Sequence, residues 1–471
     1  MNKTKIIATV GPATTEKQVL MGIIENGVDV IRINMSHATH SYCKKIIEQI
    51  NEINKELKLH VPIMLDLAGP EVRVQKIEHG EVELLPDSKI KIYADGRIGN
   101  NESISVNKEE LIQYAKFNSL LKLDDGKITL QVLNKTEEYL ECTILTGGVL
   151  KSGKSVNVPG VDLHLPFLSE KDKSDVLFAH KNHVDYVALS FVRDGEDILE
   201  VTDLLIDQKD DHLSVISKIE CESAIEEIDE IIRLSDGVMV ARGDLGVEIP
   251  LERVPGVTKM VINKCHSAGK ISIIATDLMS SMEYSIEPTR AEVSDVANAV
   301  LDGVDAIVLT GETTIGLYPV ETVSMMEKII ESTEVDINYY DLLDKAMRTE
   351  KQDITGALAY SVVECADRLK ARAIVIPTMT GHTAKKISRF RPSCPIIAIS
   401  PNEEVLRELS MYFGIYTYPI KEIKNFDKMI DNARKVVLSK INLNPFDKFI
   451  VTGGYPLGQS QHTNFMKIEE L

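Results

Sequence analysis

Cysteine is scarce in this chain: only six occur among 471 residues, and no two of them form a C-x-x-C pair. This scatter excludes a dense disulfide framework and the common cysteine-based zinc motifs. It favours free, buried thiols in a reducing compartment, so we expect a cytoplasmic protein. The six are Cys43, Cys142, Cys221, Cys265, Cys365 and Cys394.

Positive charge is also in short supply. The chain has 53 Lys and Arg against 72 Asp and Glu, which gives a formal net charge of −19. Phosphate backbones attract basic surfaces, so this balance argues against nucleic acid or an anionic membrane as the main partner. A small anionic ligand would then need local cations or metal ions for its binding.

Long apolar runs are absent, and none approaches the roughly 18 residues that a membrane-spanning helix needs. The first residues, "MNKTKIIATVGPA", hold only five apolar side chains before Gly11, too few for a signal peptide. Low-complexity segments and short repeats are missing as well. With 44% hydrophobic residues, a chain of this length can build sizeable cores, and two to four domains are expected.

Short β-branched runs alternate with amphipathic stretches over much of the chain. Such near-continuous apolar strands, alternating with helices such as 221–235 and 254–269, predict a parallel sheet covered on its faces. Eight such units predict a (β/α)8 TIM barrel, a fold that carries its chemistry at the carboxyl ends of the strands. The predicted strands are 4–10, 29–35, 61–67, 185–192, 213–219, 236–242, 271–277 and 305–311.

Polar or charged residues stand at nearly every one of these strand ends. A ring of them at successive ends is hard to explain as a solvated face. These residues include Arg32, Asn34, Ser36, His37, Asp66, Ser190, Arg193, Lys218, Glu220, Arg242, Gly243, Asp244, Thr276 and Glu312.

Two further regions complete the predicted organisation. Residues 71–163 are rich in short strands and turns, and they predict an all-β domain inserted after the third barrel strand, over the active face. Residues 342–471 show their own strand–helix alternation and predict a C-terminal open α/β domain. The barrel itself would then comprise residues 1–70 and 164–341.

One short motif, Gly148 to Ser155 in "GGVLKSGKSVNVPG", matches the phosphate-binding pattern G-x-x-x-x-G-K-S. That pattern works only where a helix follows the loop, because the first N–H groups of the helix bind the phosphates. Here Pro159 comes before a helical turn can form, and the alternating valines favour a strand. We interpret the stretch as a turn between two strands, in which Lys154 can still contact a phosphate.

The sequence pattern that points most strongly to a functional site is "SKIE" followed by "MVARGDLG". Lys218 and Glu220 are two residues apart on a strand, so both project to one side. Asp244 ends the next strand. Two carboxylates and a lysine at neighbouring strand ends suit Mg²⁺ together with an anionic substrate, since Mg²⁺ prefers one or two carboxylates plus substrate oxygens. A structural salt-bridge cluster would look the same in sequence and stays an alternative.

A second group of oxygen donors surrounds "RINMSH". The two-residue strand period places Arg32, Asn34 and Ser36 on one face, and Asp66 ends the neighbouring strand. Asn, Ser and Asp oxygens without thiolate or imidazole suit an alkali or other hard cation better than zinc.

Three other residues carry weaker signals. Gly243 lets backbone N–H groups approach a ligand carboxylate, because glycine has no Cβ. Thr276 offers a hydroxyl, although a lone threonine here is more often a satisfied core residue. Arg73 follows a turn set by Pro70, and it is either a phosphate contact or a surface charge.

In the C-terminal region, "TMTGHTAKKISRFRP" is a candidate anion site, because hydroxyls and helix-start N–H groups could meet a phosphate there. An ordinary capped helix is the alternative. The residues concerned are Thr378, Thr380, Gly381 and Thr383.

Long motifs in this chain resemble those of the pyruvate kinase family, nearly end to end. They are "TKIIATVGPA", "RINMSH", "DLAGPEVR", "VNVPGVDLHLPFLSEKD", "ISKIE", "DGVMVARGDLGVEIP", "EPTRAEVSDVANAVLDGVDAIVLTGETT", "GLYPVETV" and "FIVTGG…TNFMKIEEL". The resemblance implies a barrel domain, an inserted β-barrel lid, a regulatory α/β domain and, usually, a homotetramer. The reaction it implies is phosphoenolpyruvate plus ADP giving pyruvate plus ATP, in glycolysis.

The resemblance also implies roles for residues. Glu220 and Asp244 would bind Mg²⁺ or Mn²⁺, and Lys218 would stabilise the phosphoryl group in flight and the enolate left behind. Thr276 would sit near the carbon that is protonated, the turn 241–244, with Gly243, would hold the substrate carboxylate, and Arg32 would meet phosphate. The set Asn34, Ser36, Asp66 and the Leu67 carbonyl would bind K⁺, and Glu71 resembles the glutamate of K⁺-dependent members.

On the nucleotide side, Arg32, Arg73, Asp125 and Lys154 resemble contact residues. The threonine-rich loop around Gly381 resembles the sugar-phosphate effector site of the family, although a nucleotide effector stays open. We expect K⁺ and a divalent cation as cofactors.

Several positions depart from the family pattern. Leu67 and Ala68 stand where Thr-Lys is usual, Ala38 replaces a glycine, Cys221 an asparagine, and Asp277 a glutamine; "TGETTIGLYP" also departs from "SGETAxGxYP". The principal groups remain, so activity is expected. The alternatives are a paralogue with an altered substrate, a non-catalytic metabolite-binding regulator, and a Mg²⁺-dependent enolate lyase on the same barrel type.

Overall fold

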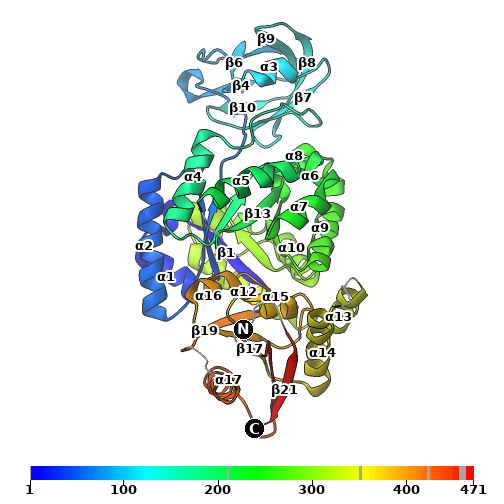
Figure 1. Ribbon diagram of the computed structural model, residues 1–471. Helices are drawn as coiled ribbons and strands as arrows, with labels where there is room; N and C mark the ends of the chain where they lie inside the picture. The colour runs from blue at the N-terminus through cyan, green and yellow to red at the C-terminus, as the bar shows by residue number, and fades with distance from the viewer. Residues whose placement is uncertain (1, 209–211, 349–352, 422–424, 456–462, 471) are drawn as a thin grey trace.

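Eight parallel strands close into a barrel in this computed structural model, which describes residues 2–208, 212–348, 353–421, 425–455 and 463–470 (Figure 1). Each strand pairs with the next along the barrel, and the first pairs with the last. Nearly all of their residues are buried, because side chains fill the interior and helices cover the outside. The predicted barrel is confirmed. Its strands are β1 (Lys5–Thr9), β2 (Val30–Asn34), β3 (Ile63–Asp66), β12 (Tyr186–Leu189), β13 (Ser214–Ile219), β14 (Gly237–Ala241), β15 (Ile271–Ala275) and β16 (Ala306–Leu309).

Helices surround the barrel, and two of them start with reciprocal capping boxes, at Ser169 and at Thr289. The stretch 221–235, predicted as one helix, is two, because Glu227 leaves the helical conformation between them (φ −94°, ψ 15°). The helices are α1 (Lys17–Glu25), α2 (His40–Leu57), α4 (Glu170–Lys181), α5 (Gly195–Asp207), α6 (Glu222–Glu226), α7 (Ile228–Leu234), α8 (Arg242–Glu248), α9 (Val254–Ala268), α10 (Arg290–Leu301), α11 (Gly311–Thr314) and α12 (Pro319–Glu334).

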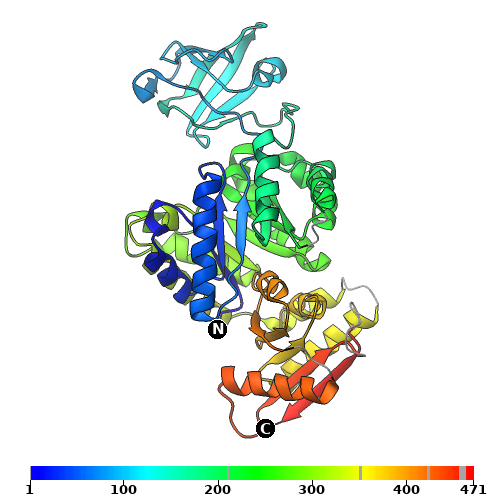
Figure 2. The same ribbon diagram turned by 60° about the vertical axis from the view of Figure 1, so that its left-hand side comes forward.

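The region inserted after β3 forms a separate domain at one end of the molecule, with its own apolar core (Figure 2). Six strands form one sheet, in the order β11-β7-β8-β9-β5-β6, and β10 pairs with β4 in a second. The two sheets make a half barrel, because β10 pairs with β4 and leaves the larger sheet open. The elements are β4 (Glu81–Leu84), β5 (Lys89–Tyr93), β6 (Ser103–Ser105), α3 (Glu110–Tyr114), β7 (Leu120–Leu123), β8 (Ile128–Lys135), β9 (Tyr139–Thr146), β10 (Gly148–Lys151) and β11 (Val156–Asn157).

The inserted domain is built of strands, as predicted, and also contains the short helix α3. The motif at Gly148 to Ser155 spans β10 and the turn before β11, and a strand follows Lys154 instead of a helix. The stretch is thus a turn between strands, as its valines indicated, and the P-loop hypothesis is excluded.

The C-terminal region folds as the predicted open α/β domain, at the opposite end of the barrel (Figures 1 and 2). Its sheet has the order β19-β18-β17-β20-β21, in which β21 runs antiparallel. That last strand was not predicted. The elements are α13 (Tyr339–Arg348), α14 (Ile354–Leu369), β17 (Ile374–Pro377), α15 (His382–Ser388), β18 (Ile396–Ser400), α16 (Glu403–Leu409), β19 (Ile415–Pro419), α17 (Phe426–Lys440), β20 (Lys448–Gly453) and β21 (Phe465–Glu470).

Buried ion pairs fix this domain against the amino ends of the barrel strands. The Arg391 guanidinium bonds both carboxylate oxygens of Asp305, at 2.8 and 2.7 Å, and Arg407 bonds Asp185 at 2.7 Å. The C-terminal domain thus closes one end of the barrel, and the insertion faces the other. Within the residues described, no helix is long and apolar enough to cross a membrane.

Candidate active site at the mouth of the barrel

The carboxyl ends of five barrel strands, and the segments after them, surround a small polar cavity of about 140 Å³. Residues far apart in the sequence meet here because parallel strands of a barrel end at the same rim. Nine of the predicted site residues line it. They are Arg32, Asn34, Ser36, Asp66, Leu67, Arg73, Lys218, Glu220 and Asp244.

Lys218 lies at the centre of this cavity. Its Nζ is 2.8 Å from Oε1 of Glu220 and 3.4 Å from Oδ1 of Asp66, and it donates to the hydroxyl of Ser190 at 2.8 Å. Burial alone would lower the pKa of Lys218, but the two carboxylates outweigh it and raise the pKa. The ammonium is therefore held charged in a nearly dry site.

The two carboxyl groups predicted to bind a metal face the same space. Burial raises the pKa of Glu220 to about 7, against the attraction of Lys218, and Asp244 adds to the rise by repulsion. The pKa of Asp244 is raised too, by burial first and then by Asp125 and Glu71, while Lys218 opposes the rise. Two carboxylates that repel each other in a polar cavity fit a divalent cation, which would relieve that repulsion.

Asp66 and Arg32 form a buried pair across β3 and β2. Arg32 Nε lies 2.6 Å from Asp66 Oδ2, and Nη1 donates to the Thr9 hydroxyl at 2.7 Å. Although burial alone would raise the pKa of Asp66, Arg32 and Lys218 hold it below its usual range. The register brings Asn34 opposite Asp66, so the strand period places these groups at one rim.

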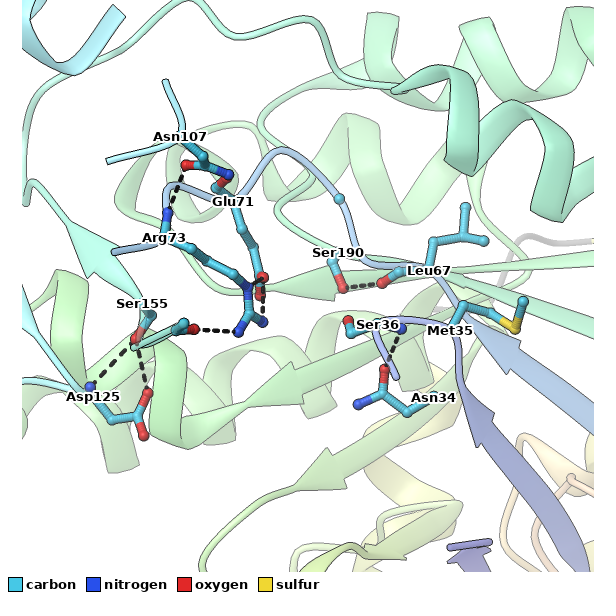
Figure 3. Close-up of polar contacts among 12 residues, drawn as sticks. Asn34, Met35, Ser36, Leu67, Glu71, Arg73, Asn107, Asp125, Ser155 and Ser190 are labelled. Carbon is cyan, nitrogen blue, oxygen red and sulfur yellow. Dashed lines mark hydrogen bonds and ion pairs between the residues drawn. The ribbon is translucent and has the colours of Figure 1, made fainter. Parts of the chain in front are cut away.

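Three of the residues predicted to bind K⁺, Asn34, Ser36 and Leu67, lie near one another in Figure 3. The Asn34 side chain accepts from the Ser36 N–H at 2.9 Å, and the Leu67 carbonyl accepts from the Ser190 hydroxyl at 2.8 Å. All of these donors are neutral oxygens except Asp66, a set that fits an alkali cation.

Arg73 reaches the mouth from the hinge of the insertion. Its Nε lies 2.6 Å from Glu71, and its Nη1 donates to the Gly153 carbonyl at 2.9 Å (Figure 3). A larger cavity of about 750 Å³ continues from here between the insertion and the barrel, lined by Arg73, Asp125, Lys154 and Asp244 among others. Lys154 pairs with Asp124 at 2.7 Å, and Ser155 donates to Asp125 at 3.1 Å.

Gly243 and Thr276 are neighbours at the ends of β14 and β15. The Gly243 N–H donates to the Thr276 hydroxyl oxygen at 2.7 Å, and that hydroxyl donates to the Ala275 carbonyl at 2.7 Å. A Cβ at position 243 would stand only 3.2 Å from Thr276 Oγ1, so the close approach favours glycine.

The predicted effector residues lie elsewhere: Thr378, Thr380 and Gly381 are in the loop between β17 and α15, and Thr383 is in the first turn of α15. Thr378 accepts from the Gly381 N–H at 2.9 Å, and Thr383 shares a hydrogen bond of 2.8 Å with Thr463. Thr380 is exposed in the same loop. This loop belongs to the C-terminal domain, so the barrel lies between it and the end that the insertion faces (Figure 1).

Among the residues described, no three His, Cys, Asp or Glu side chains are grouped as a preformed metal site. A Mg²⁺ site of only two carboxylates, completed by substrate oxygens and water, would not form such a group.

Sequence reasoning missed three contributors to the site. Ser190 links Lys218 to the Leu67 carbonyl, and the Phe191 N–H donates to Glu220 at 2.7 Å. Lys171 donates to the Met35 carbonyl at 2.7 Å and supports the loop after β2. The sequence marked Ser190 only as a strand-end residue. The Phe191 N–H is a backbone group and Lys171 lies on the distant helix α4, so no sequence motif connects either of them to the site.

Comparisons with known proteins agree along the whole chain. A family model described as pyruvate kinase, barrel domain, matches residues 1–323, and one described as pyruvate kinase, alpha/beta domain, matches residues 356–469. The chain is 41% identical over 470 residues to a pyruvate kinase of Sporosarcina psychrophila, covering 99% of this chain and 80% of that protein. It is 40% identical over 474 residues to a pyruvate kinase of Clostridium perfringens, covering 100% of both.

The fold agrees as well. The crystal structure of a pyruvate kinase from Cryptosporidium parvum superposes with a TM-score of 0.93 at 36% identity, covering 100% of this chain and 96% of that chain.

Proposed function

The chain belongs to the pyruvate kinase family, and on that premise we propose that the cavity around Lys218 is where it transfers a phosphoryl group from phosphoenolpyruvate to ADP. The bond between phosphorus and the enol oxygen breaks, and a bond forms to a terminal oxygen of ADP. The enolate then takes a proton at C3 and becomes pyruvate. The observation that carries this assignment is the buried, charged Lys218 between Glu220 and Asp66.

Two positively charged side chains, Lys218 and Arg32, face the negative charge that develops on the phosphoryl group and the enolate. The transition state of phosphoryl transfer spreads negative charge over oxygens, so catalysis is mostly positioning and electrostatic stabilisation. We assign Lys218 to the phosphoryl group in flight and to the enolate oxygen. Arg32, held by Asp66 and Thr9, contacts the phosphate, and the N–H groups at Gly243 and Asp244 hold the substrate carboxylate. Thr276 stands beside C3.

Glu220 and Asp244 would hold Mg²⁺ or Mn²⁺. When bound, the divalent cation supplies positive charge to the substrate oxygens. Burial raises the pKa of both carboxyls, and the Asp244 charge adds to the rise at Glu220; this crowding of negative charge supports the assignment.

Asn34, Ser36, Asp66 and the Leu67 carbonyl would hold K⁺, with Glu71 at the edge of the same cavity. The donor chemistry supports a monovalent cation here, since only one of the four oxygens is charged.

Arg73, Asp125 and Lys154 line the larger cavity, whose volume of about 750 Å³ suits a nucleotide. We therefore infer that ADP enters between the insertion and the barrel, with Arg32 at its phosphate end, and that the insertion acts as a lid. Closure would bring the Lys154 ammonium, now paired with Asp124, toward the phosphates.

Three proposals concern the whole molecule. The hydroxyls of Thr378, Thr380 and Thr383 around Gly381 would bind a sugar-phosphate or nucleotide effector. A homotetramer in the cytoplasm is the expected state. The lid would comprise residues 71–163, and the regulatory domain would start at residue 342.

The test is an assay of pyruvate formation coupled to NADH oxidation, with Mg²⁺ or Mn²⁺ and with K⁺, Na⁺ or neither. Turnover that needs both ADP and a divalent cation, and that K⁺ stimulates, supports the assignment. Binding of phosphoenolpyruvate without turnover would favour a regulatory paralogue. Product formed without ADP would favour an enolate lyase.

A further inference from the structure

The turn that follows β15 is strained. Thr276 and Asp277 have φ angles of +70° and +55°, in the left-handed region that residues with a Cβ rarely adopt. For a β-branched residue such as threonine this conformation is a genuine outlier. Strain of this kind persists only where the surrounding structure holds it, and it clusters at functional sites. The contacts that hold this turn therefore bear on the chemistry of Thr276.

The side chain of Arg242, at the neighbouring strand end, forms hydrogen bonds to this turn. Arg242 Nη2 donates to the Thr276 carbonyl at 2.9 Å and to the Asp277 carbonyl at 3.3 Å. Both carbonyls can turn toward one guanidinium because consecutive left-handed residues curl the backbone around it. Arg242 is the first residue of α8, directly after β14, so it is itself placed by the barrel.

Arg242 is in turn braced by a carboxylate. Asp295 of α10 accepts from its Nη1 at 2.9 Å and from its Nη2 at 2.6 Å, in a two-pronged pair. The Arg242 side chain is 16% exposed and that of Asp295 is 39% exposed, so the pair lies at the rim of the barrel mouth. Such paired N–H···O bonds fix the plane of a guanidinium as well as its position.

A second link aligns the hydroxyl itself. The Thr276 hydroxyl oxygen accepts from the N–H of Gly243, the residue next to Arg242. The first two residues of α8 therefore hold Thr276 at two points, its carbonyl through Arg242 and its hydroxyl through the Gly243 backbone. A rotation of the turn would break both contacts together.

We propose that Arg242, braced by Asp295, is a positioning residue that keeps the turn of Thr276 and Asp277 left-handed and thereby holds the Thr276 hydroxyl beside C3 of the substrate. The proposal rests on the proposed function, which assigns Thr276 to the protonation of the enolate. Arg242 does not touch the substrate. It acts on proton transfer, not on phosphoryl transfer, so the two steps should respond differently to its loss.

The experiment measures the two steps separately in the full-length protein. Because protonation at C3 is reversible, the enzyme exchanges the methyl hydrogens of pyruvate with solvent deuterium, which proton NMR follows in D2O with Mg²⁺ and K⁺. Phosphoryl transfer is followed as ATP formed from phosphoenolpyruvate and ADP in a single turnover. We expect R242M to slow the exchange on the order of 10²-fold, as a misplacement of about 1 Å can do, and to slow ATP formation much less. The R242K variant should recover part of the loss, because it keeps a cation near the carbonyls.

Substitution of Asp277 by glycine should partly restore the exchange lost in R242M, a rescue that a merely structural role of Arg242 would not produce. Glycine adopts the left-handed conformation without strain, so the D277G background needs the guanidinium less. We expect the loss of exchange caused by R242M to be smaller in D277G than in the parent chain, a coupling that a double-mutant cycle measures. D295N should give an intermediate loss. D302N is the matched control, because Asp302 caps the carboxyl end of α10 and forms an ion pair with the exposed Lys259, at 3.0 Å.

The T276A variant, measured in parallel, tests the role of Thr276 in proton transfer separately from the positioning role of Arg242. If T276A exchanges deuterium like the parent chain, the assignment of Thr276 in the proposed function is wrong. If T276A loses exchange while R242M and D295N keep it, only the positioning role is overturned. Equal losses of exchange and of ATP formation in R242M, without rescue by D277G, would also overturn it. If R242M does not fold, the D295N exchange rate and its dependence on D277G decide.

Discussion

Lys218 and Glu220, two residues apart at the end of β13, form a buried ion pair with Nζ 2.8 Å from Oε1. The strand period points both side chains into the same cavity, and burial of both strengthens their attraction. The pair is therefore a charge arrangement made before any ligand binds. Under the proposed function, a substrate phosphate or a divalent cation would enter a site whose charges are already positioned for it.

Replacing Lys218 by methionine should lower kcat on the order of 10²- to 10³-fold, about 3 to 4 kcal/mol, by analogy with the loss of one preorganised donor. The volume is nearly kept, but the positive charge that faces the moving phosphoryl group is gone. Initial rates of pyruvate formation at saturating Mg²⁺ and ADP measure the effect. K151M, which removes an exposed lysine of the lid, should leave kcat unchanged. A kcat of K218M within threefold of that of the parent chain would contradict the assignment of Lys218.

Replacing Glu220 by glutamine or Asp244 by asparagine should raise the Mg²⁺ concentration needed for half-maximal rate by about tenfold or more, since changes even to outer-shell groups cost 10- to 100-fold in metal affinity. Binding of Mn²⁺, followed by electron paramagnetic resonance, tests the same point without turnover. D95N, which changes an exposed aspartate of the inserted domain, serves as the control. Unchanged Mn²⁺ affinity in both E220Q and D244N would place the divalent cation elsewhere.

The lid touches the barrel through a hydrogen bond of 2.9 Å from Asn157 to Glu248, and Lys122 donates to the Val247 carbonyl nearby. Removing a hydrogen bond to a carboxylate costs about 1.5 to 3 kcal/mol. N157A should therefore loosen the lid and raise the KM for ADP by about tenfold, while the KM for phosphoenolpyruvate changes little. Steady-state kinetics with each substrate varied in turn separate the two. N134A changes an exposed asparagine of the same domain and controls for general effects; a rise in both KM values alike would contradict the idea.

Periodicity was enough to predict the barrel, because eight apolar runs alternate with helices and nearly every run ends in a polar residue. The pairing of Lys218 with Glu220 followed from their two-residue spacing alone. By contrast, the contact of Arg32 with Asp66 depends on the register of β2 and β3, which only the folded sheet sets. The partner of Arg242 lies 53 residues away on α10, where no local pattern marks it.

Two features of the fold that the sequence pattern did not specify, the strand β21 and the half barrel of the insertion, have physical reasons as well. The strand β21, "FMKIEE", was missed because its side chains are mostly half-exposed or exposed, so apolar alternation is weak. The lid was expected to close as a barrel because short alternating strands look alike in open and closed sheets. Closure depends on which edges pair, and here β10 pairs with β4 apart from the larger sheet.

His266 predicts how stability depends on pH. Its Nε2 lies 2.8 Å from the Gly303 carbonyl, and burial first, then the nearby Arg391, lower its pKa to about 3. The unfolded chain has a histidine pKa of about 6.5. Between these values the native state binds fewer protons than the unfolded state, so stability falls as pH drops below about 6.5. By pH 5.5 this one group should cost about 1.4 kcal/mol of unfolding free energy.

The H266Q variant keeps an N–H donor for the Gly303 carbonyl but does not titrate in this range. Urea unfolding at pH 7.5 and 5.5 should therefore show a smaller loss of stability for H266Q than for the parent chain, by about 1.4 kcal/mol. H79Q alters a histidine whose side chain is 89% exposed, so it should lose as much stability as the parent chain on acidification. If H266Q and the parent chain lose equally, His266 is already protonated in the folded state at pH 5.5, and the barrel does not exclude that charge from its junction with the C-terminal domain.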